Sequence, residues 1–275
     1  MKNLKYFFLG SLLMMFLSGC LQVNTKVNLN KDGSGTIEET VVMKNAVIEM
    51  MKQFAMSFDS TKSEEFNMFK EDELKSNASK FGEGVKYIAG EKYSIEGFEG
   101  YKVTYAFSDI NKIKLSPSPQ DKVPFGDELN EPEDTAVDDY LKFNFTKGDP
   151  STLVINFPKP QAKEENEVET DSAITPIEDS TFTQETEQKM MEMFDGMKMS
   201  IYFNFQDGID ETDASFVNGS EVTLMQFDFS EILKNKEVFK NFQNVKPETM
   251  EEFKAIVGDI EGIKIEFKDK VTIKF

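Results

Sequence analysis

The sequence predicts an α+β fold in which a curled antiparallel sheet carries helices on one face. Several segments of the 275-residue chain alternate apolar or β-branched residues with polar ones, as strands do when their two faces differ. Fewer segments repeat apolar residues every three or four positions, which is typical of helices that bury one side. Turn residues such as glycine and aspartate separate the segments. A curled sheet with a helix across it can enclose an apolar pocket, and the sequence permits one here.

The first predicted element is a β-hairpin formed by residues 23–29 and 36–43. Between them, Lys-Asp-Gly-Ser-Gly at 31–35 is a turn signal, because Asp-Gly and Gly supply the positive φ angles of tight turns. The stretch also has the oxygen-ligand spacing of an EF-hand calcium loop, carried by Asn28, Asn30, Asp32, Gly33 and Glu39. Its flanks alternate as strands, whereas the calcium loop needs helices. We therefore interpret it as a turn and predict no metal site.

Helical spacing predicts five helices. The first covers Asn45–Phe58, where Val47, Ile48 and Met51 form an apolar stripe. The others are expected at residues 63–81, 184–199, 230–242 with Ser230 as the N-cap, and 247–258 with Pro247 at the first helical position.

Further alternation predicts the remaining strands of an eight- to ten-stranded sheet. Residues 85–115 suggest three strands with a turn at 97–100, and residues 141–145 and 152–157 form a second clear hairpin. Single strands are expected at 199–205 and 221–229. The C-terminal segments 263–267 and 271–275 are expected to pair as a hairpin around residues 268–270.

A polar, acidic stretch at about 158–182 divides the chain. It has too few large apolar residues to offset the entropy of ordering, so we predict a disordered insertion. We expect the strands on its two sides to share one sheet, which makes residues 20–275 a single domain. Two domains that split near residue 160 are the alternative.

The N-terminal 19 residues have the three-part layout of a secretory signal. Lys2 and Lys5 provide the basic start, and residues 6–17 form a short apolar segment. A membrane-spanning helix needs about 20 apolar residues, which is more than this segment contains. Cys20, the one cysteine of the chain, follows directly.

The residues before the cysteine, Leu17, Ser18 and Gly19, resemble the lipobox of bacterial lipoproteins. The resemblance implies that a diacylglyceryl group is attached to the Cys20 thiol. It also implies that the chain is cut before this residue and that the new amine receives a further acyl chain such as palmitate. Two or three acyl chains hold a protein at a membrane almost permanently, since each buried methylene contributes about 0.8 kcal/mol.

The residues after Cys20 bear on where the anchor resides. In lipoproteins of two-membrane bacteria, an aspartate directly after the cysteine often marks retention at the inner membrane, and here Leu21 and Gln22 follow. The resemblance therefore implies the periplasmic face of the outer membrane. In a single-membrane bacterium the protein would be displayed at the cell surface.

Composition excludes several classes of function. Without residues 1–19 the chain holds 29 lysines and 50 carboxylates, a net charge of −21, which argues against nucleic acid as a partner. It contains no His, Arg or Trp. Imidazole-based catalysis, histidine-ligated metals and arginine clamps are therefore absent. We predict no catalytic, cofactor-binding or metal-binding residues, and no carboxylate pair can be singled out among 50.

Beyond the signal, the chain resembles bacterial lipoproteins of the mycobacterial LppM type. The similar features are the turn at residues 32–35 with its flanking strands, a helix that begins like residues 44–51, and a strand-turn-strand like residues 199–229. The resemblance implies a helix-and-sheet domain likened to lipid-binding helix-grip folds. The C-terminal membrane segment of that family is not matched, because this chain ends in charged, strand-like sequence.

These observations lead to three hypotheses of function. The leading one is a non-enzymatic, lipid-anchored envelope protein that binds a hydrophobic ligand or a partner protein. A carboxylate-based envelope hydrolase is the second, and it requires two carboxylates converging in a cleft. A purely structural envelope component is the third.

Overall fold

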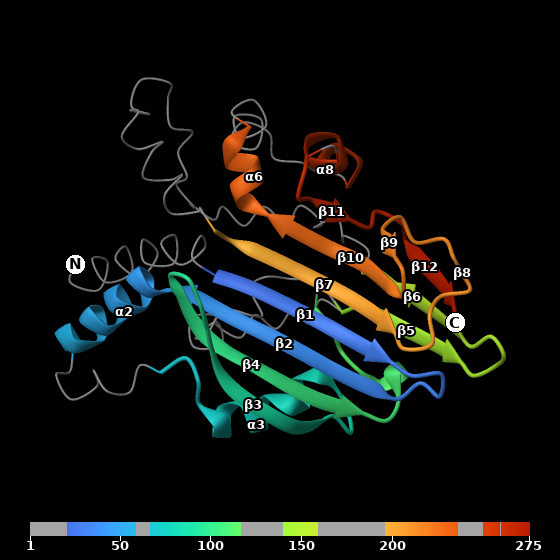
Figure 1. Ribbon diagram of the computed structural model, residues 1–275, viewed down its shortest axis with the longest axis horizontal. Helices are drawn as coiled ribbons and strands as arrows, with labels where there is room; N and C mark the ends of the chain where they lie inside the picture. Colours follow the sequence, from blue (N-terminus) through green and yellow to red (C-terminus); the bar gives the residue numbers. More distant parts are fainter. Residues whose placement is uncertain (1–20, 59–66, 117–139, 159–195, 236–249, 259) are drawn as a thin grey trace, which may run out of the picture.

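The computed structural model describes residues 21–58, 67–116, 140–158, 196–235, 250–258 and 260–275. In these residues the chain is mostly β, with a few short helices, and its strands form two sheets (Figure 1). Both sheets contain strands from each side of residue 160. The organisation of residues 20–275 as one domain stays a prediction, and most of the acidic insertion at 158–182 lies outside the described residues.

The larger sheet has eight strands. From one edge to the other, its main path runs through β11 (Lys264–Ile265), β10 (Glu221–Asp228), β7 (Lys198–Phe205), β1 (Leu21–Leu29), β2 (Gly35–Lys44), β4 (Phe98–Phe107) and β3 (Lys86–Ile95). The short β9 (Val217–Asn218) pairs with β10 beside this path. The predicted hairpin of β1 and β2 is confirmed, with Leu21 opposite Met43.

This sheet is mixed, so the expectation of a purely antiparallel sheet was wrong. β1 and β7 run in parallel over eight residue pairs, from Gln22 opposite Lys198 to Leu29 opposite Phe205. A tight turn forces its two strands to be antiparallel, but a long connection does not. Because some 170 residues separate the two strands in sequence, the local turn signals contain no information about their relative direction.

The smaller sheet has four strands, in the order β5 (Lys142–Thr146), β6 (Thr152–Asn156), β12 (Lys270–Lys274) and β8 (Glu211–Thr212). The predicted β5–β6 hairpin is confirmed. The predicted C-terminal hairpin was wrong, because β11 pairs with β10 in the large sheet whereas β12 pairs with β6 and β8. The two C-terminal strands therefore belong to different sheets.

The second and fourth predicted helices are shorter than expected, and the first has its expected length. That helix, α2 (Asn45–Phe58), matches its expected bounds. The second prediction is replaced by α3 (Glu71–Asn77) and the 3-10 turn η2 (Ala78–Phe81).

The two C-terminal helices and the strands around residue 113 also differ from expectation. α6 (Phe229–Lys234) is capped by the Asp228 carboxylate, which accepts a hydrogen bond from the Ser230 amide at 3.0 Å, so Ser230 is not the N-cap. α8 (Met250–Val257) lies within its predicted range. Residues 85–115 form two strands followed by the 3-10 turn η3 (Ile110–Lys112), not three strands. The predicted helix at 184–199 lies largely outside the described residues, and its last two residues belong to β7.

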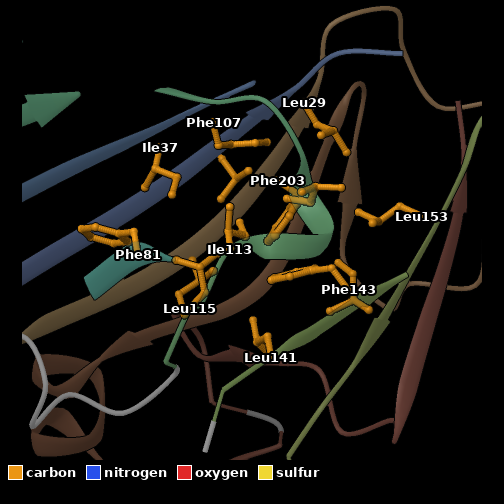
Figure 2. Packing of buried hydrophobic residues seen from close by; sticks show 14 of the residues in the cluster. Leu29, Ile37, Phe81, Phe107, Ile113, Leu115, Leu141, Phe143, Leu153 and Phe203 are labelled. Carbon is orange, nitrogen blue, oxygen red and sulfur yellow. The ribbon is translucent and has the colours of Figure 1, made fainter. Parts of the chain in front are cut away.

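The main core lies between the two sheets. Buried residues from both sheets and from α3, η2 and η3 form one cluster, part of which is drawn in Figure 2. Phe143 of β5 and Phe203 of β7 meet there with ring centroids 5.7 Å apart. A second sheet therefore covers much of the face on which the sequence predicted helices.

This arrangement corrects the helix-grip expectation, because the helices do not form a layer along the sheet. In Figure 1, α2 extends from the end of the large sheet where β1 begins, whereas α6 and α8 lie beside β10 and β11. α2 packs Val47 and Ile48 against residues of β1 and β2. α6 and α8 form a small separate cluster around Ile232 and Val257. The two sheets, both open, thus provide the scaffold.

Candidate functional site

The two faces of the large sheet differ in chemistry. Successive residues of a strand point to opposite faces, and Val27 and Phe203 are fully buried on the face toward the small sheet, the inner face. Their neighbours Lys26 and Tyr202 lie on the outer face, where both are half-buried. The outer face is therefore the side on which polar side chains can meet a ligand.

The strand register assembles three rows of outer-face residues. The row nearest the start of β1 holds, from β3 to β10, Tyr93, Gly100, Val42, Gln22, Lys198 and Asp228. The middle row holds Glu91, Lys102, Thr40, Asn24, Ser200 and Gln226. The third row holds Ala89, Thr104, Glu38, Lys26, Tyr202 and Thr223. Each row combines residues from six strands.

Most residues of these rows line an open recess of about 890 Å³, which we call the outer recess. Its walls and floor carry amide, hydroxyl, carboxylate and ammonium groups, and Val42 is buried in the floor. The recess lies on the outer face and not between the sheets, where apolar side chains pack against one another. A ligand in this recess would meet mainly hydrogen-bonding groups.

Two tyrosines stand on different strands of the outer recess. The ammonium of Lys102 lies 3.6 Å from the ring centroid of Tyr93, which is a cation–π contact. The hydroxyl of Tyr202 donates a hydrogen bond to the Gln226 side chain at 3.5 Å. A tyrosine combines a flat apolar ring with a polar tip, and for this reason it is enriched at binding interfaces.

The charges of the outer recess are close to balance. Lys102 and Lys198 stand among three outer-face carboxylates, those of Glu38, Glu91 and Asp228. The Lys198 ammonium lies 2.7 Å from the Asp228 carboxylate. The chain as a whole carries a net charge of −19, which repels acidic partners at long range. Within the recess, however, a partner meets both signs of charge at contact distance.

The first row depends on Gly100 of β4. A Cβ atom added at this position would lie 2.0 Å from the carbonyl oxygen of Val41, which is far inside contact distance. Glycine therefore allows the backbone of β4 to approach β2 here.

Two polar residues interrupt the inner face opposite the recess. Thr25 and Glu39 are cross-strand partners and are 2% and 7% exposed. Burial, and secondly the Glu39 carboxylate, raises the pKa of the Tyr101 and Tyr105 hydroxyls well above the ordinary value. The Tyr105 hydroxyl donates a hydrogen bond to the carbonyl of Leu74 at 3.0 Å. At neutral pH both phenols are protonated, so they are hydrogen-bond donors and not bases.

The calcium-loop spacing is a hairpin turn, as predicted. Asn28 points to the outer face and Glu39 to the inner face, so the sheet separates the first and last candidate ligands. The Asp32 carboxylate accepts hydrogen bonds from the amide and hydroxyl of Ser34 at 3.0 and 2.6 Å, which lower the Asp32 pKa. Within the described residues, no group of three or more His, Cys, Asp or Glu side chains could hold a metal ion.

The predicted lipid-attachment residue, Cys20, lies just outside the described residues, as do Leu17, Ser18 and Gly19. β1 begins at the very next residue, Leu21, which is 6% exposed. Among the helices of the described part, none is long and apolar enough to cross a membrane. The signal peptide and the acylation stay predictions.

The sequence alone did not single out the residues that characterise the outer recess, namely Tyr93, Lys102, Lys198 and Tyr202. A signal was present for Lys102, Lys198 and Tyr202, which occupy the polar phase of alternating strands, whereas Tyr93 shares its phase with Ala89 and Ile95. That phase marks an exposed face, but it does not tell which strands are neighbours. The recess depends on the pairing of β1 with β7, which brings Lys26 beside Tyr202.

Comparison with known proteins gives one distant likeness. No protein-family model matches the chain, and no curated protein gives a significant match. The chain is similar to the folded domain of the Mycobacterium tuberculosis protein LppM, determined by NMR, with a TM-score of 0.31 and 9% sequence identity. The match covers 77% of this chain and 84% of that domain. It agrees with the resemblance noted in the sequence only as a distant likeness of fold.

Proposed function

We propose that this protein is a lipid-anchored, non-enzymatic protein of the bacterial envelope whose outer recess binds a segment of a partner protein. The observation that carries the proposal is the composition of the recess. It presents tyrosines, both signs of charge and many amide and hydroxyl groups on one open surface. Tyrosine is enriched at protein–protein interfaces, which also have a polar rim and about one hydrogen bond per 100–200 Å².

The chemistry of the outer recess favours a partner protein over a hydrophobic ligand. Sites for small apolar ligands are mostly lined by hydrophobic side chains, with few polar groups. Here the central positions of the floor are Thr40, Asn24 and Ser200. Extended peptides and exposed loops carry backbone amides and mixed side chains that match such groups.

The anchor in this proposal is Cys20 within its lipobox. Acylation would fix an acidic, water-exposed body at a membrane surface, at the periplasmic face of the outer membrane in a two-membrane cell. The absence of histidine and arginine from the sequence supports a binding role over catalysis, because it removes the most common general base and the usual anion clamp.

The anchor is tested by intact-mass measurement of the protein purified from its native membrane. We expect a mass that corresponds to residues 20–275 with a diacylglyceryl group and a further acyl chain. The matched variant is Cys20→Ser, which should leave the membrane fraction. A native product with a free thiol, or a Cys20→Ser variant that still sediments with membranes, would refute lipid anchoring.

The binding role is tested by photocrosslinking in living cells. A photoreactive amino acid replaces Tyr93 or Tyr202, and the control position is Ile88, which lies on the same strand as Tyr93, outside the recess, and is 58% exposed. We expect one defined protein adduct from both tyrosine positions and none from Ile88. Adding Lys102→Glu should reduce that adduct strongly, because it replaces one of two cations in the recess. Equal adducts at all three positions, or none at the tyrosines, would contradict the proposal.

A further inference from the structure

The distance between the predicted anchor and the folded body is very short. Leu21 is both the first residue of β1 and a buried one, and one peptide bond joins it to Cys20. Consecutive Cα atoms are about 3.8 Å apart, so no linker separates the lipid attachment from the sheet. A flexible linker would let the body rotate freely above a membrane, whereas a lipid on Cys20 would hold one end of the large sheet at the bilayer.

The register defines which segments share that end of the sheet. Leu21 pairs with Met43, and α2 starts two residues after Met43. The turn between β3 and β4 lies at the same end, because the amide of Asn45 donates a hydrogen bond to the carbonyl of Gly97 at 2.9 Å. In Figure 1, α2 extends outward from this end of the sheet. We call α2, Ile95 and the β3–β4 turn at residues 96–97 the anchor-proximal rim.

Exposed apolar side chains occur on this rim. Among the described residues, the large hydrophobic side chains with the greatest exposure are Met50, Ile88, Ile95, Tyr140 and Val217. Met50 lies on α2 and is 37% exposed, and Ile95 directly precedes the β3–β4 turn and is 39% exposed.

The electrostatics of α2 suit a membrane interface. The helix has two charged residues in 14, Glu49 and Lys52, and their side chains form an ion pair at 2.8 Å. A strongly acidic protein is repelled by anionic lipid headgroups, and this internal neutralisation removes the contribution of α2 to that repulsion, whereas the β3–β4 turn adds the exposed Glu96. Val47 and Ile48 of α2 are buried against the sheet, so the contact with lipid falls to Met50, the exposed large apolar side chain among the described residues of this helix.

We infer that the anchor-proximal rim rests on the bilayer surface, with Met50 and Ile95 in contact with lipid. This inference rests on the proposed lipid anchor at Cys20. In this orientation the strands of the large sheet point away from the membrane. The outer recess then begins at the membrane surface, because Gln22 of its first row is only two residues from Cys20.

The test uses the absence of tryptophan and the single cysteine of the chain. The chain from Cys20 onward is coupled through its thiol to a maleimide lipid in phosphatidylcholine vesicles. Single tryptophans are introduced as Ile95→Trp, Met50→Trp or, as a control at the opposite end, Val217→Trp, which is a position of similar exposure at 45%. Quenching by brominated phosphatidylcholine then reports contact with the acyl chains.

We expect a large loss of emission for Ile95→Trp and Met50→Trp and almost none for Val217→Trp. Circular dichroism of each variant confirms that the fold is retained. Equal quenching at both ends, or stronger quenching at Val217→Trp, would overturn the inferred orientation. Because the chemical coupling replaces biological acylation, this result is independent of the mass measurement that tests the anchor itself.

Discussion

The inner and outer faces of the large sheet are built from the same strands, yet their side chains differ in burial and polarity. On β7, Phe203 is completely buried, whereas the adjacent Tyr202 opens onto the outer recess. On β2, Ile37 packs in the core, whereas Glu38 accepts a hydrogen bond from Asn28 on the outer face. The inner face buries apolar area and so stabilises the fold, whereas the outer face presents polar groups at modest energetic cost.

The difference between the faces shows where sequence changes can alter binding without loss of the fold. A substitution on the inner face removes packing that cannot be replaced, because protein cores are densely packed. A substitution on the outer face changes groups that water can also satisfy. The following experiments test this separation.

The largest expected effect is the loss of a central core ring. Phe203→Ala should lower the free energy of unfolding by about 3–5 kcal/mol, because it removes buried contacts and leaves a cavity between the sheets. The matched change on the other face, Tyr202→Ala, should cost much less. Urea unfolding followed by circular dichroism measures both, and comparable losses would show that the outer face also carries the stability of the fold.

The next effect concerns the β1–β2 turn, which touches the small sheet. Gly33 has a φ of +86°, a conformation that costs a residue with a side chain about 1–3 kcal/mol. A Cβ atom there would also lie 2.6 Å from the ring of Phe145 on β5. Gly33→Ala should therefore destabilise the protein by at least this amount. The double variant with Phe145→Leu separates the two causes: if the ring contact contributes, the glycine change will cost less in that background.

A smaller effect is expected from the buried phenols of the inner face. The folded state raises the pKa of Tyr101 and Tyr105, so it keeps their protons where the unfolded chain releases them. Stability from these groups is complete below about pH 10, the unfolded pKa, and falls as the pH rises above it. A pH titration followed by absorbance at 295 nm measures the ionisation of the phenols. Compared with the unsubstituted protein, Tyr105→Phe should lose absorbance change only at the highest pH values. A loss from the part near pH 10 would contradict the assigned burial.

The smallest effect is expected from the ion pair of Lys26 and Glu221 on the outer face, whose charged atoms are 3.5 Å apart. Both side chains are about one-third exposed, so water and salt screen their attraction. Lys26→Met should change the free energy of unfolding by only about 0–1 kcal/mol. A thermal-melting series from low to high salt provides the measurement. A loss as large as that of Phe203→Ala would remove the distinction between the faces.

Much of the local structure could be predicted from the sequence. The β1–β2 and β5–β6 hairpins and helix α2 occur where alternation, turn residues and helical spacing placed them. These elements are defined by residues close in sequence, and so their signals are local. The turn at Asp32 and Gly33 could also be distinguished from a calcium loop, because its flanking residues alternate as strands.

Other features of the fold could not be predicted from patterns of residues close in sequence. Two apolar segments near the C-terminus looked like a hairpin, but β11 and β12 join different sheets. In the range 63–81, where one helix was predicted, the described residues are helical from Glu71 onward. Leu74 and Phe81 pack against the core there and so stabilise these turns. The outer recess could not be predicted at all, since its rows combine residues from six strands.

The sequence by itself determined the acidic charge, which follows from composition alone. It also determined the alternation of strand faces, the tight turns and the likeness of residues 17–20 to a lipobox, because each depends on residues within a few positions of one another. Only the tertiary structure decided that there are two sheets, that β1 and β7 are parallel, and that Tyr93, Lys102 and Tyr202 line one recess. Strand partners far apart in the chain are selected by the burial of apolar faces against each other. That selection is a property of the whole fold and leaves no mark in any single segment.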